Sequence, residues 1–178
     1  MSIVVYHVVT ERPMVQGQEL LFDETHHNGV YDRVMTFQKI INGEPVHTPT
    51  ADLIRKNLDK WSKVAYRELA LEKIRRAEFP QYQSRMACLY TSQTLEEAQN
   101  WAGFFKNIGR DVYSIVKLRV YGRTFSGDAC NCFDGVADET VTLPFARRYW
   151  QVAPTEKPVI ETIADGRIVV EELVEKYK

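Results

Sequence analysis

Short apolar runs, rich in β-branched residues, separate the amphipathic segments of this chain. The run at residues 3–9 stops at charged residues and Pro13, which predicts a strand buried on both faces. Residues 112–121 alternate between apolar and mixed positions, which is typical of a long strand with two different faces. The run at residues 86–91 predicts another buried strand, and residues 14–49 predict short strands or helices joined by loops.

A helical pattern extends from residue 50 to residue 79, where apolar side chains recur at spacings of three and four residues. The apolar positions shift after Leu69, which predicts a bend near residue 68 or a second buried face before Pro80 ends the helix. The opposite side of this segment carries a basic stripe, defined by Lys56, Lys60, Lys63 and Arg67. Such a stripe is usually a solvated helix face, but it also offers a surface to an anionic partner.

A second helix is predicted to begin after Thr94. Thr94 and Glu97 have the spacing of a capping box, in which each side chain accepts a hydrogen bond from an otherwise unpaired backbone N–H group. Gly109 is placed to adopt the left-handed conformation that commonly ends a helix. The segment 94–109 is therefore the most completely specified element of the sequence.

The last third of the chain predicts a loop, a short helix and a hairpin. Residues 122–138 contain turn residues, and residues 143–150 favour a short helix. Runs at 159–163 and 167–174 flank Asp165-Gly166, which is a strong signal for a β-hairpin. Helices placed between strands, followed by strands joined by a hairpin, predict an α+β fold with a mainly antiparallel split β-sheet and flanking helices.

Composition narrows the class of protein. The chain has 178 residues, of which 44% are hydrophobic and 26% charged, so it predicts a single domain, 1–178. A net charge of −1 disfavours general nucleic-acid binding. The absence of a long apolar run and of a signal-peptide pattern predicts a cytoplasmic protein that does not enter a membrane. Cys88, Cys130 and Cys132 are expected to be reduced thiols, and their spacing disfavours a metal site.

No Walker loop, dinucleotide-binding glycine triplet, nucleophile elbow or zinc-protease helix is present. Three other pieces stand out: Tyr6-His7 in the first strand, the segment 89–92 leading into a helix, and Glu161 in a late strand. In this order of His, Tyr and Glu the chain resembles the ADP-ribosyltransferase-like superfamily. More narrowly, YHVVTE, YRELALEKIR and LYTSQTLEEAQNWA resemble an uncharacterised family of small bacterial proteins, and this likeness covers most of the chain.

The resemblance implies that the protein uses NAD as a substrate. His7 would hydrogen-bond the ribose of the adenosine half, and Tyr90 would stack on nicotinamide. Glu161 would be the catalytic residue, holding the nicotinamide ribose and stabilising the positive charge that develops as the glycosidic bond lengthens. Thr10 and Ser92 would be secondary polar contacts of the same ligand.

Each of these residues also has a purely structural explanation. His7 fits a core histidine with a satisfied ring nitrogen, Tyr90 fits a strand-end aromatic packed on Trp101, and Glu161 fits a solvent-facing strand position. Glu171 and Glu172, in the other arm of the expected hairpin, are rival carboxylates.

Two functions therefore stay open. The first is an NAD-dependent ADP-ribosyltransferase, with an unknown macromolecular acceptor, or an NAD glycohydrolase. The second is a catalytically inactive nucleotide- or protein-binding module of the same fold, because Val159 stands where the superfamily often has an acceptor-orienting Glu or Gln. Several arginines could form a bidentate pair with a diphosphate, namely Arg75, Arg76, Arg85, Arg147 and Arg148.

Overall fold

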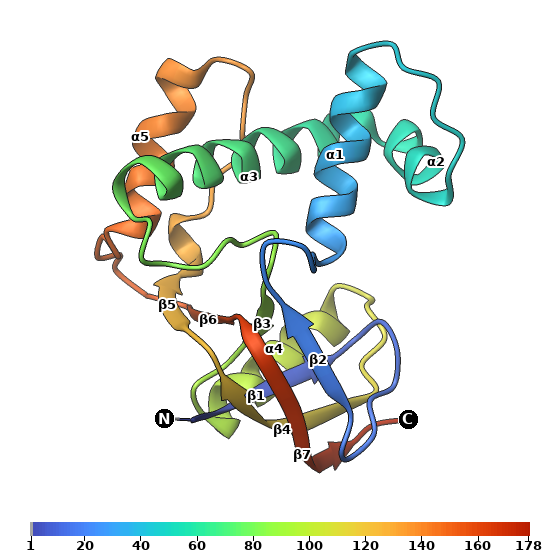
Figure 1. The fold of residues 1–178 in the computed structure, drawn as a ribbon, viewed down its shortest axis with the longest axis vertical. Helices are drawn as coiled ribbons and strands as arrows, with labels where there is room; N and C mark the ends of the chain where they lie inside the picture. Colours follow the sequence, from blue (N-terminus) through green and yellow to red (C-terminus); the bar gives the residue numbers. More distant parts are fainter. Residues whose placement is uncertain (1) are drawn as a thin grey trace. The chain divides into compact units, whose positions relative to one another are not determined.

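The computed structural model describes residues 2–178, which form two compact units (Figure 1). The first, here called the sheet unit, comprises Met1–Asp23, Cys88–Ser126 and Ile160–Lys178. The second, the helical unit, comprises Glu24–Ala87 and Gly127–Val159. Each unit is assembled from separate stretches of the sequence. Whether the chain behaves as the single domain expected from its length stays a prediction.

Antiparallel strands build the sheet unit, which agrees with the predicted α+β class. One sheet has the order β1-β4-β7-β2 and the other has the order β3-β6-β5. In chain order the strands are β1 Ile3–Val9, β2 Glu19–Phe22, β3 Leu89–Thr91, β4 Ser114–Tyr121, β5 Thr124–Asp128, β6 Ile160–Ala164 and β7 Gly166–Lys176. Backbone hydrogen bonds between Tyr6 and Ser92 join β1 to the residue that follows β3.

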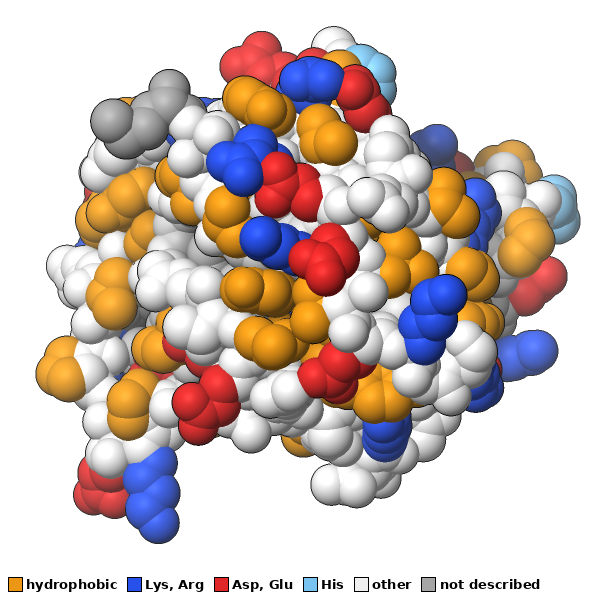
Figure 2. All heavy atoms as spheres, turned by 90° about the horizontal axis from the view of Figure 1, so that it is seen from below, with side chains coloured by type: hydrophobic (Ala, Val, Ile, Leu, Met, Phe, Trp, Pro, Cys, Tyr) orange, Lys and Arg blue, Asp and Glu red, His pale blue; other side chains and the backbone are white. Residues whose placement is uncertain are grey.

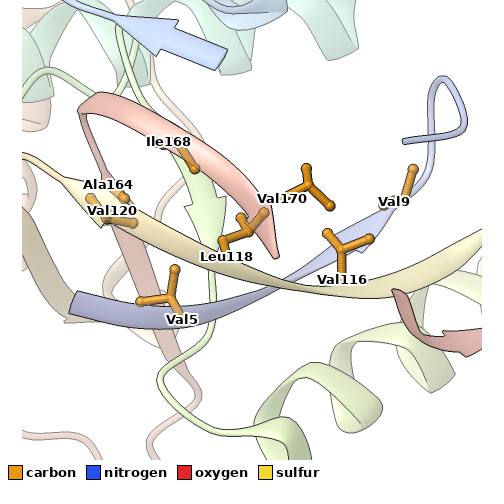
Figure 3. Close-up of a cluster of buried hydrophobic side chains, with 8 residues drawn as sticks. All are labelled: Val5, Val9, Val116, Leu118, Val120, Ala164, Ile168 and Val170. Carbon is orange, nitrogen blue, oxygen red and sulfur yellow. The ribbon is translucent and has the colours of Figure 1, made fainter. Parts of the chain in front are cut away.

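The alternation of side chains along β1 divides the core of the sheet unit between two faces. Val5 and Val9 lie on one face, in a cluster with buried side chains of β4, β7 and β6 (Figure 3). Val8 lies on the other face, where it packs with Ile115 against α4, Leu95–Asn107. The prediction that this strand is buried on both faces is therefore confirmed.

The signals at both ends of α4 are confirmed. Thr94 accepts a hydrogen bond from the backbone of Glu97, whose carboxylate accepts in return from the backbone N–H of Thr94. At the other end Gly109 has a φ of +79°. Its N–H donates to the carbonyl of Lys106, and the N–H of Arg110 donates to the carbonyl of Phe105. These two bonds define a Schellman motif, which only a residue that tolerates positive φ can form without strain.

The hairpin predicted around Asp165-Gly166 is wrong. β6 pairs with β3 in one sheet, whereas β7 pairs with β2 and β4 in the other. The carboxylate of Asp165 accepts from the backbone N–H and the guanidinium of Arg123, and the N–H of Asp165 donates to the Arg123 carbonyl. These bonds hold Asp165 against the connection between β4 and β5. Asp165 and Gly166 therefore connect strands of two different sheets rather than closing a hairpin.

Four helices make up the helical unit: α1 Gly29–Ile41, α2 Pro49–Lys56, α3 Leu58–Glu78 and α5 Glu139–Trp150. The segment expected to bend near residue 68 breaks instead at Asn57, whose extended φ of −147° ends α2. The Asn57 side chain then accepts from the N–H of Lys60 and caps α3. Beyond this break α3 buries Leu71 and Ile74, which confirms the predicted second buried face.

A buried ion pair joins parts of the helical unit. Arg85 Nε donates to Glu68 at 2.9 Å, and Arg85 Nη1 donates to the hydroxyl of Tyr149 at 2.6 Å. Burial alone would raise the pKa of Glu68, but the charges of Arg85 and Arg67 outweigh it and lower that pKa. Glu68 is therefore ionised, and its charge is compensated inside the unit.

Two further predictions need correction. The segment 122–138 is not all loop, since it contains β5 and a short 3₁₀ turn, Ala129–Asn131. Of residues 86–91, only Leu89–Thr91 form a strand, because the preceding residues form a turn. Met86, Ala87 and Cys88 are nevertheless buried, as expected.

No helix among residues 2–178 is both long and apolar enough to cross a membrane. On the face drawn in Figure 2, cationic side chains are interspersed with acidic and hydrophobic ones.

The crossing at Asp165 gives the first testable prediction. A Cβ atom added at Gly122 would lie 2.1 Å from the Asp165 carbonyl oxygen, so Gly122→Ala forces backbone to move and should lower the free energy of unfolding by about 3 kcal/mol. Gly103→Ala, in the exposed middle of α4 with no atom within 4 Å of the added Cβ, should raise it by about 0.5–1 kcal/mol. Urea unfolding measures both values, and equal stabilities for the two variants would contradict the close approach.

Candidate functional site

His7 is held against the neighbouring strand through its ring. The Nδ1 atom lies 2.7 Å from the backbone carbonyl oxygen of Tyr90. Because a carbonyl only accepts hydrogen bonds, His7 Nδ1 carries the proton, and Nε2 of the neutral ring is an acceptor. The ring is half-buried, on the same face of β1 as Val5 and Val9.

The surroundings of His7 favour its neutral form. Burial lowers the pKa of His7 from 6.5, and the positive charge of Arg110 lowers it further. The hydrogen bond to Tyr90 and the charge of Glu11 act in the opposite direction without reversing the shift. At neutral pH the imidazole is therefore uncharged and suited to a hydroxyl group rather than an anion.

The pairing of β3 with β6 places Tyr90 and Glu161 on the same face. Tyr90 stands opposite Ile163, and Thr91 stands opposite Thr162. Glu161 lies two residues before Ile163, so alternation directs it to the side of the ladder that carries Tyr90. Diagonal neighbours of this kind are separated by roughly 7–8 Å in an antiparallel pair. Two of the predicted site residues thus come from adjacent strands of one sheet.

Ser92 and Thr10 have different places. Ser92 is 2% exposed, and its backbone exchanges hydrogen bonds of 2.7 and 2.9 Å with Tyr6. This link between strands is what brings His7 next to Tyr90. Thr10 follows β1, and its hydroxyl accepts a 2.8 Å hydrogen bond from Arg110. The structure therefore groups Thr10 with Arg110. Tyr90 and Glu161 share one face of the β3–β6 pair, whereas His7 lies on the other face, with Val5 and Val9.

The rival carboxylates lie in the other sheet. Glu171 forms an ion pair with Arg119, and Glu172 stands opposite Lys117 in the pairing of β7 with β4. Neither is in a strand that pairs with β3. The position of Glu161 beside Tyr90 is thus not shared by the other two candidates.

Trp101 has a role that the sequence pattern does not reveal. Its indole N–H donates to the carbonyl of Ile160 at 3.0 Å, which ties α4 to the residue immediately before Glu161. Its ring contacts Phe104 and Phe105. A tryptophan on the apolar stripe of α4 is expected in the core, but its donor partner depends on the fold.

A row of hydroxyl groups also lies beside the site. Gln93 Nε2 donates to the Ser126 hydroxyl at 2.8 Å, and that hydroxyl lies 2.8 Å from the hydroxyl of Thr162. Thr91 in turn donates to the Thr162 carbonyl. Thr91 and Thr162 face the side opposite Tyr90 and Glu161, and the bridge between Tyr6 and Ser92 puts His7 on that same side.

Most of the arginines considered as diphosphate partners have acidic partners within the helical unit. Arg75 and Arg76 pair with Glu72, and Arg147 pairs with Glu78. Arg85 pairs with Glu68, as described above.

Ion pairs also compensate part of the positive charge of the basic stripe. Lys63 contacts Asp59 and Asp134, and Arg67 contacts Glu68. The stripe is also interrupted, because Lys56 belongs to α2 and the other three residues belong to α3. Its four positive charges therefore do not form one continuous surface.

Cys88 is buried, Cys132 is half-buried and Cys130 is exposed, and none of the three is in a disulfide. Within the described part of the chain, no group of three or more His, Cys, Asp or Glu residues is arranged to hold a metal ion.

One family model matches the chain over nearly its whole length. The model of a family described as "Protein of unknown function (DUF2441)" matches residues 5–176. Comparison with the curated proteins gave no match. The match supports the expected likeness to an uncharacterised family and leaves the ADP-ribosyltransferase-like relationship a prediction.

The environment of His7 predicts a specific pH dependence. Because its pKa is lower in the folded protein than the value of 6.5 for the unfolded chain, the unfolded state binds more protons as the pH falls below 6.5. The stabilising contribution of neutral His7 is therefore present above about pH 6.5 and is lost on acidification. His7→Asn keeps a donor for the Tyr90 carbonyl but does not titrate. Urea unfolding between about pH 7.5 and pH 5 should show a shallower loss of stability for this variant than for the wild type, and equal slopes would disprove the assignment.

Proposed function

Because the chain belongs to the DUF2441 family, whose description assigns no function, we propose a function from its own residues: binding of NAD and cleavage of its nicotinamide glycosidic bond. Glu161 would be the catalytic residue, and His7 and Tyr90 would bind the dinucleotide. In this proposal the fold is ADP-ribosyltransferase-like.

The observation that carries the proposal is the 2.7 Å hydrogen bond between His7 Nδ1 and the Tyr90 carbonyl. It fixes the imidazole next to the strand whose next neighbour, β6, carries Glu161. An imidazole, a phenol and a carboxylate that are far apart in the sequence are thereby placed on adjoining strands. The face that Tyr90 and Glu161 share, together with the bond of His7 to the Tyr90 backbone, is what supports a shared ligand.

The chemistry assigned to Glu161 follows from charge. When the C–N bond of NAD breaks, nicotinamide leaves with the bonding electron pair and becomes neutral, while the ribose carbon acquires positive charge. A carboxylate beneath the ribose stabilises this charge and accepts a hydrogen bond from the 2′-hydroxyl. Water, or a nucleophilic group of an acceptor, then bonds to the ribose carbon and loses a proton. The products are nicotinamide and either ADP-ribose or an ADP-ribosylated acceptor.

The neutral state of His7 fits its assigned role. With Nδ1 engaged by Tyr90, Nε2 remains an acceptor for a ribose hydroxyl. A protonated imidazole would instead favour an anion, and the low pKa of His7 argues against that state. The proposal therefore assigns His7 to a sugar rather than to a phosphate.

A second candidate function is a nucleotide-binding module without catalysis. Val159 occupies the position two residues before Glu161, so no side chain there can orient an acceptor nucleophile. Its backbone N–H donates to Asp128, and this bond fixes the segment leading into β6. This observation favours hydrolysis or simple binding over transfer to a macromolecule.

Removal of the carboxylate separates catalysis from binding. Glu161→Gln should lower the rate of nicotinamide release from NAD by at least about 100-fold, because a neutral amide cannot stabilise the developing positive charge. Its affinity for NAD in calorimetry should change by less than about threefold. Chromatographic detection of nicotinamide, with and without lysate as acceptor, measures the rate.

Glu172→Gln is the matched control, since Glu172 is an exposed carboxylate of the other sheet, and its rate should equal that of the wild type. Binding of NAD without release of nicotinamide by the wild type would favour the module without catalysis. Absence of NAD binding at millimolar concentration would exclude both functions.

A further inference from the structure

A hollow of about 380 Å³ lies at the C-terminal end of α4, within the sheet unit. We call it the α4 hollow. Its charged lining residues are Lys106, Arg110, Asp111 and Lys178, and Tyr177 contributes an aromatic wall. Its volume falls in the range of roughly 300–1,000 Å³ that is usual for sites of small ligands.

The Schellman motif at the end of α4 determines where the two cations of this segment lie. The left-handed Gly109 reverses the chain, so that Arg110 returns over the last turn of the helix. There the Arg110 guanidinium carbon lies 4.6 Å from the centroid of the Phe105 ring. A contact between these two positions commonly accompanies the motif, and here it fixes a positive charge.

Lys106 and Arg110 are held by neutral groups. Arg110 donates to the hydroxyl of Thr10 at 2.8 Å, and Lys106 Nζ lies 3.4 Å from the centroid of the Tyr177 ring. Within residues 2–178 neither side chain forms a salt bridge, whereas most arginines of the helical unit do. Both side chains are therefore positioned while their charges remain uncompensated by a direct carboxylate partner.

The side chains of the lining carry a net positive charge. Three cations face one carboxylate, Asp111, which is paired with Lys178. The negative charge of Glu175 interacts with Lys106 and makes the net charge less positive. The Glu175 oxygens also accept hydrogen bonds from Tyr177 and Gln99. The helix C-terminus adds about half a negative charge. These groups offset part of the positive charge, and the guanidinium fork of Arg110 retains donors beyond the one given to Thr10.

We propose that the α4 hollow is an anion site that takes a phosphate or diphosphate group, with Arg110 as a planar donor and Lys106 as a point charge. The anion comes either from a nucleotide or from free inorganic phosphate or pyrophosphate, which share this chemistry. The site goes beyond the proposed function and does not depend on catalysis at Glu161. If the cations serve only to stabilise the helix terminus, no anion will bind there.

Titration with inorganic pyrophosphate tests the site directly. In calorimetry at low salt, the wild type should show saturable binding that weakens as salt is added. Lys106→Met combined with Arg110→Met should weaken it at least tenfold, and Arg110→Lys, which keeps the charge but loses the fork, should weaken it less. Circular dichroism establishes that each variant is folded.

Lys60→Met is the matched control, because Lys60 is also a cation beside an aromatic ring, 5.1 Å from the centroid of Trp61, but lies in the helical unit. Its pyrophosphate affinity should equal that of the wild type. Absence of saturable binding by the wild type, or equal affinities of the wild type and the double variant, would overturn the proposal.

Further titrations identify the source of the anion. AMP that binds at least tenfold more tightly than inorganic phosphate, with adenosine not binding, indicates a nucleotide, and equal affinities of AMP and phosphate indicate the anion alone. Glu161→Gln should retain full pyrophosphate affinity. Failure of nicotinamide release with intact pyrophosphate binding therefore removes the proposed function only, and the reverse result removes the α4 hollow only.

Discussion

The contact of Asp165 with Arg123 is the constraint from which the arrangement of the sheet unit follows. It holds the start of β7 against the β4–β5 connection, where Gly122 and Gly166 approach each other's backbone too closely for a side chain. β6 is thereby directed to β3, and β7 to β4 and β2. The switch therefore accompanies the pairing of β6 with β3, which puts Glu161 on the same face as Tyr90.

Local signals in the sequence predicted local structure well, but they predicted poorly which strands pair when those strands are far apart in the sequence. α4 was predicted at both ends, because the capping box and Gly109 act within a few residues of the helix they limit. The Asp165-Gly166 pair correctly indicated the positive φ of Gly166, but not the hairpin. Its partner Arg123 is 42 residues earlier, so no pattern around the turn shows that the two following strands enter different sheets. The break at Asn57 has a different reason: the apolar stripe continued through it, although asparagine is better suited to capping than to a helix interior.

The candidate site stays a prediction, but the structure shows contacts around it that the sequence pattern did not reveal. The His7 ring bonds the backbone carbonyl of Tyr90, and the roles of all five predicted residues stay predictions. Trp101, which anchors the residue before Glu161, and Arg110, which binds Thr10, were missed. The signal for Arg110 was present: a cation directly after a helix-ending glycine must fold back over the last turn. The sequence could not show that Thr10 contacts Arg110 and that Tyr177, near the other end of the chain, contacts Lys106.

The two proposed sites differ in charge, and β1 connects them. His7 is uncharged and offers an acceptor, while three residues later Thr10 holds the cation of the α4 hollow. Extended backbone rises about 3.3 Å per residue, so the two positions are separated by about 10 Å along the chain. Arg110 lowers the pKa of His7, which means that its charge is felt at the imidazole across this separation. An anion bound at Arg110 would weaken that influence and bring the pKa of His7 closer to its ordinary value. Under this proposal, occupation of the α4 hollow would change the electrostatics at His7 whether or not a single dinucleotide reaches both sites.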